Sequence, residues 1–229
     1  MGPSSKADAA VGVGQSPERT DSRRGPWLPL AIAYGIIQVA LWTSGGTQKM
    51  VSLAAAVWVI GVTLARHRPA RQLGIGFTGL TRALWVIPLG GVGVALILLA
   101  GWLGGTIHGL HGPKAPGLQV EGYFIWTVVQ QFILQSFFYV NLEELLGAQR
   151  ALWVSVALFT LAHIPNPVLL VGTLLGGIFF VEMFQRYRNI YPIALVHGML
   201  GMALGVSVPD FLMRHMRVGI GFLRYHGQG

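Results

Sequence analysis

The sequence predicts an all-α integral membrane protein, a bundle of seven to eight transmembrane helices. Of its 229 residues, 53% are hydrophobic and only 10% are charged, whereas soluble domains carry roughly 25% charged residues. Apolar stretches recur along the chain, and several approach the roughly 20 residues that a helix needs to cross a bilayer. These observations exclude an ordinary soluble domain.

Seven apolar stretches account for most of the chain, and loops rich in Gly, Pro and Ser separate them. In chain order the stretches are Trp27–Trp42, Met50–Ala65, Ala83–Gly104, Gly122–Val140, Ala151–Ile164, Val168–Phe184 and Ile190–Val208. We therefore expect residues 26–208 to form one multi-span membrane domain.

The two ends of the chain differ from this domain. Residues 1–25 are small, polar and charged and lack the apolar region of a signal peptide, which predicts a disordered basic tail. Residues 209–229 form a basic C-terminal segment, in which Phe211–Leu223 is expected to be a weak or interfacial eighth helix.

The positive charges predict the orientation of the chain. With the N-terminus in the cytoplasm, most Lys and Arg residues lie inside, and only Lys49 and Lys114 fall in outer loops. Arg214, Arg217 and Arg224 do not fit seven spans, so either the eighth weak or interfacial helix at Phe211–Leu223 intervenes or one span is re-entrant. We expect a multi-pass protein of the cell (plasma or inner) membrane that contacts anionic lipid and no nucleic acid.

Aromatic and small residues also fit membrane helices. Aromatic side chains at span ends suit the interfacial belt and need no functional explanation; they are Trp27, Trp85, Tyr123, Trp153 and Tyr191. The pairs Gly172/Gly176 and Gly201/Gly205 predict close helix packing.

Polar side chains within the spans are few, and each costs free energy unless it has a partner or lines a wet cavity. Apart from Gln38 they lie in four consecutive spans, at Gln130, Gln131, Gln135, His163, Glu182 and His197. Gln131 and Gln135 share a helix face, and Gln130 lies on the adjacent flank. A hydrogen-bonded cluster that joins helices is one interpretation, and a functional site is the other.

The sequence alone does not decide whether the protein binds a metal ion. The absence of Cys excludes a thiol nucleophile and a cysteine-ligated metal. His163 and His197 could ligate zinc or haem iron, and His108 and His111 share a long loop, but zinc usually takes three or four protein ligands. We expect no cofactor, with a divalent metal as the alternative.

Four segments follow one another in a recognisable order: QQFILQSFF, FTLAHIPNP, the Gly-rich LLVGTLLGGIFF and IYPIALVHGMLG. The region from about residue 71 to 204 resembles the CPBP family of CAAX prenyl proteases and bacteriocin-processing enzymes, also called Abi. Its motifs there read Glu-Glu-x-x-x-Arg, Phe-x-x-x-His, and His-x-x-x-Asn or His-x-x-x-Asp. Phe159 and His163 match the second motif, and His197 matches the start of the last. The resemblance implies an intramembrane endopeptidase for a membrane-embedded or lipid-modified substrate.

The chain departs from that pattern at the residues that carry chemistry. Gln130 and Gln131 replace the two glutamates, Gln135 replaces the arginine, Ser136 the usual glycine and Gly201 the Asn or Asp. In the family the glutamate is taken to activate water while the histidines position it. An amide cannot accept that proton, and general-base help is worth about 10² to 10⁴ in rate. The three glutamines keep the hydrogen-bonding capacity of the motif and remove all its charges.

Other acids and other functions stay open at this point. Glu182 is a surrogate acid, although Arg186 four residues later offers it an ion pair. The candidates are a peptidase that uses His163, His197 and the motif glutamines, and a non-proteolytic relative that binds a membrane partner or acts on another hydrophobic substrate. A membrane protein with a His-ligated metal or haem is the third candidate.

Overall fold

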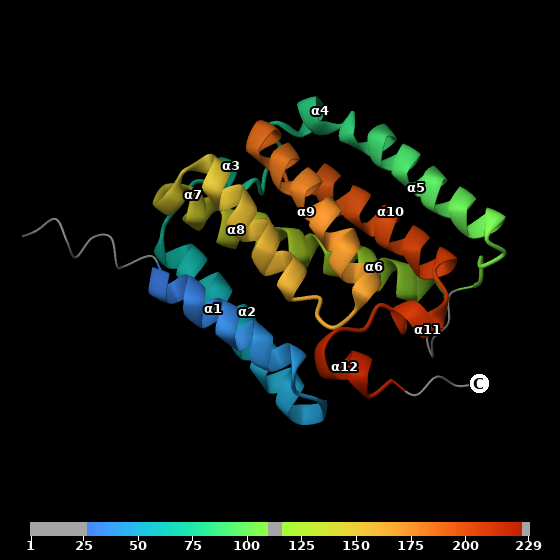
Figure 1. Cartoon of the computed structure of the whole chain (residues 1–229). Coiled ribbons are helices and arrows are strands. Elements are labelled where there is room, and N and C mark those ends of the chain that lie inside the picture. Colours follow the sequence, from blue (N-terminus) through green and yellow to red (C-terminus); the bar gives the residue numbers. More distant parts are fainter. Residues whose placement is uncertain (1–26, 110–115, 226–229) are drawn as a thin grey trace, which may run out of the picture.

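The computed structural model describes residues 27–109 and 116–225, and every regular element in these ranges is a helix (Figure 1). The all-α prediction is therefore confirmed for the described part of the chain. The tail predicted at residues 1–25 lies outside the described residues, as do His111 and Lys114.

The predicted apolar stretches are helical over most of their length. The elements are α1 Trp27–Leu41, α2 Gly45–Ala65, α3 Ala70–Leu73, α4 Leu80–Ala83, α5 Val86–Leu103, α6 Pro116–Gln131, the π-helix η1 Phe132–Tyr139, α7 Val140–Leu146, α8 Ala148–Leu161, α9 Pro167–Tyr187, α10 Tyr191–Ser207, α11 Asp210–Met213 and α12 Gly219–Leu223. The stretch predicted at Gly122–Val140 is divided, because α6 passes into η1 at Phe132.

Three helical segments are long and apolar enough to cross a membrane, namely Gly45–Ala65, Leu80–Leu103 and Pro167–Tyr187. Shorter apolar helices occupy Trp27–Leu41, Ala148–Leu161 and Tyr191–Ser207. Large apolar side chains on the outer faces of the long segments are exposed, as at Leu53 in Gly45–Ala65 and Leu96 in Leu80–Leu103. Such faces suit lipid, where apolar surface carries no penalty. A membrane protein fits these helices, and the total of seven to eight spans stays a prediction.

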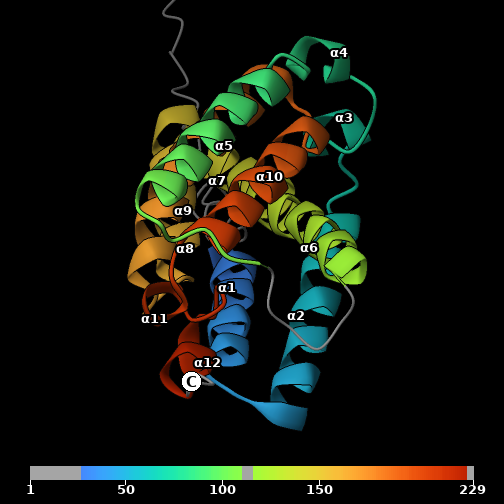
Figure 2. The same ribbon diagram turned by 90° about the vertical axis from the view of Figure 1, so that its right-hand side faces the viewer.

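Helices α5 and α10 lie side by side along their length (Figures 1 and 2). Glycines on α5 allow this approach: a Cβ at Gly90 would lie 2.5 Å from Cγ1 of Val196, and one at Gly101 would lie 2.8 Å from Cβ of Ser207. Small residues let helices pack closely where lipid gives no hydrophobic driving force.

The glycine pairs predicted for this role behave differently. A Cβ at Gly172 would make only ordinary contact with Leu204, at 3.6 Å, and one at Gly205 would lie 3.6 Å from the sulfur of Met216. Gly172 and Gly176 instead line a cavity. Gly201 bears the prediction out, because a Cβ there would overlap the side chain of Tyr123 on α6, whereas Gly172 and Gly205 do not. Spacing identifies small residues but not the helix that each one faces.

The C-terminal segment forms two short helices, α11 and α12, in place of the single helix expected at Phe211–Leu223. Arg214, His215 and Met216 all have positive φ, between 49° and 59°. Right-handed helix cannot pass through such a run of non-glycine residues. The two short helices lie at the end of the bundle opposite to α3, α4 and α7 (Figure 1).

The hydrophobic core lies between η1, α8, α9 and α10. Phe137 and Tyr139 of η1 are fully buried and pack in one cluster with Val156 of α8, Phe184 of α9 and Val196 of α10. Gln135 lies on η1 and His197 on α10, while Gln130 and Gln131 end α6 and His163 follows α8, so the motif residues lie in or next to the elements that form the core.

Candidate functional site

The π-helix η1 carries the end of the glutamine motif. Helices of this type are rare, and they occur frequently at functional sites. The side chains of Gln135 and of Gln131, the last residue of α6, are fully buried. The hydroxyl of Ser136 donates a hydrogen bond to the carbonyl of Leu73, which fastens η1 to α3. The residue at the family's glycine position is therefore a structural anchor.

A chain of hydrogen bonds connects the motif to the last histidine. The Nε2 of Gln135 donates to Oε1 of Gln131 at 3.2 Å, and Nε2 of Gln131 donates to Nδ1 of His197 at 3.1 Å. Because an amide nitrogen can only donate, Nδ1 of His197 is the acceptor, and the neutral ring carries its proton on Nε2. The prediction that Gln131 and Gln135 share a face is confirmed.

His163 has the opposite tautomer. Its Nδ1 lies 2.7 Å from the carbonyl oxygen of Phe159 and must donate to it. Helix α8 ends at Leu161, so this carbonyl is among the last ones of the helix, which have no partner within it. The neutral ring of His163 therefore leaves Nε2 as a hydrogen-bond acceptor.

Phe159 positions both imidazoles. Its ring centroid lies 4.9 Å from that of His163 and 5.9 Å from that of His197, in edge-to-face geometry. On its other side His197 contacts the ring of Phe180, with centroids 5.0 Å apart. Packing between aromatic rings fixes the orientation of each imidazole, which gives the Phe-x-x-x-His pattern a physical reason.

The two histidines line a cavity of about 380 Å³ between α1, α2, α6, η1, α8, α9 and α10. Its walls are mostly apolar, with side chains such as Val59, Leu134 and Leu169. Gln130, the glutamine on the adjacent flank, also faces this cavity. No Asp or Glu is among the described residues that line it.

Tyr123 replaces a missing side chain of the last motif. Gly201 stands where the family has Asn or Asp, and a Cβ on Gly201 would overlap the hydroxyl of Tyr123. Tyr123 lines the cavity and accepts or donates no hydrogen bond within the described part of the chain. Tyr123, expected only as an interfacial belt residue, thus also forms part of the cavity wall. A glycine at a position that normally carries a polar side chain is the signal that could have revealed it.

The candidate acids lie outside this cavity. Glu182 forms the expected ion pair with Arg186, at 2.6 Å, and is not among the residues that line the cavity. Glu143 pairs with Arg188, and Glu144 pairs with Arg68 at 2.6 Å. Each of these carboxylates therefore forms an ion pair with an arginine, and none of them lines the cavity.

The metal interpretation receives little support from the donor atoms. The described residues contain no group of three or more His, Cys, Asp or Glu that could hold a metal ion. Of the two cavity histidines, only His163 has a ring nitrogen free to coordinate in these tautomers. Both ring nitrogens of His108 lie 3.0 Å from backbone carbonyls, those of Gly109 and Val208, and these carbonyls raise the pKa of the ring.

Comparison with known families gives one match. The model of the family described as type II CAAX prenyl endopeptidase, Rce1-like, matches residues 120–203. Searches against curated proteins and against solved structures found no match. The matched residues run from α6 through η1, α7, α8 and α9 into α10, and so contain the entire hydrogen-bonded cluster. The resemblance predicted from the sequence is confirmed over these residues: the segment that carries the glutamine motif and both histidines is similar to the Rce1-like CAAX prenyl endopeptidases.

Proposed function

We propose that this chain is a CAAX-protease-like membrane protein that binds an apolar, membrane-embedded or lipid-modified segment in its cavity, without glutamate-dependent hydrolysis. The observation that carries the proposal is a mostly apolar cavity that is lined by Gln130, His163 and His197 and by no described carboxylate.

The cavity suits an apolar ligand. Its volume of about 380 Å³ falls within the roughly 300–1,000 Å³ that is usual for ligand pockets. Each buried CH₂ group contributes about 0.8 kcal/mol to transfer from water. Gln130 and the hydroxyl of Tyr123 lie on the cavity wall, where they can bind an amide or carbonyl group of the ligand.

A slow hydrolase is the second candidate, and the tautomers of the histidines favour it. Nε2 of His163 can accept a proton from water, and Nε2 of His197 can donate a hydrogen bond to a developing oxyanion. In this reaction His163 would replace the carboxylate as the general base, a role that is worth about 10² to 10⁴ in rate.

The binding proposal can be tested with the full-length protein in vesicles and a farnesylated peptide that carries a photo-crosslinking group. Gly172→Leu would fill the cavity, because Gly172 lines it and has room for a side chain. Gly61→Leu is the matched control, since a Cβ there meets nothing within 4 Å and Gly61 is outside the cavity lining. We expect the first variant alone to lose crosslinking. Equal crosslinking by both variants would overturn the proposal.

Hydrolysis is tested on the same peptide by mass spectrometry. The triple change Gln130→Glu, Gln131→Glu and Gln135→Arg should raise cleavage by about 10² to 10⁴ if only the charged motif is missing. Cleavage by the unmodified chain at the rate of the triple variant would show that the glutamines suffice, and would favour the hydrolase.

A further inference from the structure

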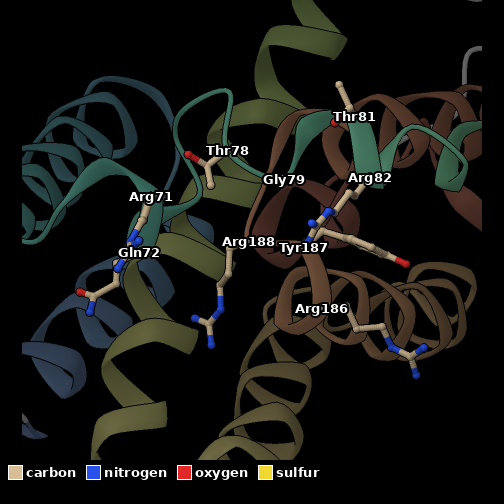
Figure 3. Close-up of a pocket in the computed structure, with 9 residues that line it drawn as sticks. All are labelled: Arg71, Gln72, Thr78, Gly79, Thr81, Arg82, Arg186, Tyr187 and Arg188. Carbon is tan, nitrogen blue, oxygen red and sulfur yellow. The ribbon is translucent and has the colours of Figure 1, made fainter.

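A second cavity, of about 550 Å³, lies at the end of the bundle between the α3–α4 segment and the C-terminal end of α9 (Figure 3). We name it the arginine pocket after Arg71, Arg82, Arg186 and Arg188, which line it. It shares no described residue with the apolar cavity, and no described Asp or Glu lines it. The pocket therefore concentrates positive charge.

Two of these arginines are not neutralised. Arg186 pairs with Glu182, and Arg188 pairs with Glu143. Arg71 and Arg82 form no ion pair with any described carboxylate, and both are exposed. A guanidinium group offers a planar fork of donors that matches the oxygens of a phosphate. The pocket has two such groups available, on α3 and α4.

The walls of the pocket are held in place by Asn189, which is fully buried. Its Nδ2 donates to the carbonyls of Gly76 at 2.7 Å and Thr78 at 3.1 Å, and the amide of Ile190 donates to the carbonyl of Gly74 at 3.1 Å. These bonds fix the segment between α3 and α4 against the start of α10. Because the walls are fixed in advance, a ligand bound there would incur little ordering cost.

The close approach of Gly79 to α9 adds to this fixation. Gly79 has a φ of 76°, and a Cβ there would overlap the carbonyl oxygen of Tyr187. Only glycine fits this contact without strain. Figure 3 shows Gly79 next to Tyr187, with Arg82 beside them.

The pocket also has the features of a membrane interface. The indole Nε1 of Trp85 donates to the hydroxyl of Tyr187 at 2.8 Å, and the two rings meet edge to face. Trp and Tyr are enriched at the level of lipid headgroups. The pocket lies where two long apolar segments, Leu80–Leu103 and Pro167–Tyr187, begin and end.

We propose that the arginine pocket binds the phosphate of an anionic phospholipid headgroup, with Arg71 and Arg82 as the principal ligands and the hydroxyls of Thr78 and Thr81 within the same pocket. This site is separate from the apolar cavity and does not depend on the function proposed for it. It would hold one lipid against α3, α4 and α9, beyond the diffuse attraction of basic residues to an anionic surface.

The test compares the preference of the full-length protein for spin-labelled phosphatidylglycerol over spin-labelled phosphatidylcholine, in phosphatidylcholine vesicles. Changing Arg71→Gln and Arg82→Gln together should lower this preference by roughly tenfold or more. The control pair, Arg66→Gln and Arg150→Gln, removes the same charge outside the pocket. It should lower the preference by no more than about twofold, because salt screens attraction at a distance.

Two outcomes would overturn the proposal. Equal losses in the two double variants would show that lipid preference reflects total charge and not a built site. A preference that survives in the pocket variant would show that the lipid binds elsewhere. A further arm adds inorganic phosphate to the detergent-purified protein and measures the melting temperature. Phosphate could raise the melting temperature only when Arg71 and Arg82 are both present, while the protein shows no preference for phosphatidylglycerol. That result would assign the pocket to free phosphate.

Discussion

The apolar cavity and the arginine pocket have polar linings of opposite kinds, one uncharged and one charged. The cavity presents Gln130, His163 and His197 and no described charge, while the pocket presents four arginines. Gln131 and Gln135, behind the cavity wall, are fully buried, whereas Arg71 and Arg82 are exposed. The difference follows the cost of desolvation, which is modest for a hydrogen-bonded amide and large for an ion.

This comparison explains why uncharged side chains suit the buried positions 131 and 135. The amides of Gln131 and Gln135 form one chain that ends on His197, and no charged group takes part in its two hydrogen bonds. A single carboxylate or guanidinium at either position would be an ion without a counter-ion in the core. At the arginine pocket the same single change would be exposed to water and lipid headgroups.

The largest expected effect is that of Gln135→Arg, which places a cation in the uncharged, buried cluster. We expect it to lower the free energy of unfolding by about 3 to 5 kcal/mol, the range for an unpaired buried charge. Chemical denaturation in detergent measures this. Arg82→Gln, the reciprocal change in the arginine pocket, should stay within about 0.5 kcal/mol. A Gln135→Arg variant as stable as Arg82→Gln would contradict the neutral-cluster interpretation.

A smaller effect is expected for Gly201→Ala, which tests whether the hydroxyl of Tyr123 lies against position 201 at the cavity wall. The added Cβ would overlap the Tyr123 hydroxyl, so we expect a loss of about 1 to 3 kcal/mol from overpacking. Tyr123→Phe should recover part of the loss in the double variant. Gly35→Ala is the control, because its Cβ meets nothing within 4 Å, and alanine there should be neutral or stabilising. Additive effects of the two changes would show that Tyr123 and Gly201 do not interact.

The smallest effect concerns the arginine pocket and its support. Asn189→Ala removes the donor to the carbonyls of Gly76 and Thr78, and should cost about 1 to 2 kcal/mol. Amide hydrogen exchange should become faster in the segment between α3 and α4, while η1 stays protected. Gln72→Ala, at an exposed position of the same pocket, should change neither quantity. Faster exchange in η1 as well would mean that Asn189 supports the whole core.

Much of the fold could be predicted because membrane helices are local. Each apolar stretch satisfies its own backbone hydrogen bonds and shows itself by composition alone. The shared face of Gln131 and Gln135 also follows from their spacing, and the resemblance carried by Phe159, His163 and His197 placed the cluster correctly. The π-helix was not predicted, because nothing in FILQSFFY distinguishes it from an α-helix of the same residues.

The sequence by itself determined the all-helical architecture, the order of the motifs and the loss of charge from the glutamine motif. Only the tertiary structure decided that Tyr123 fills the space at Gly201, that Glu182 lies outside the cavity, and that α3, α4 and α9 enclose an arginine pocket. Helix formation depends on neighbours within one turn, so composition reveals it. A cavity depends on which helices meet and on the space that their side chains leave unfilled. Both depend on residues that are distant in the sequence.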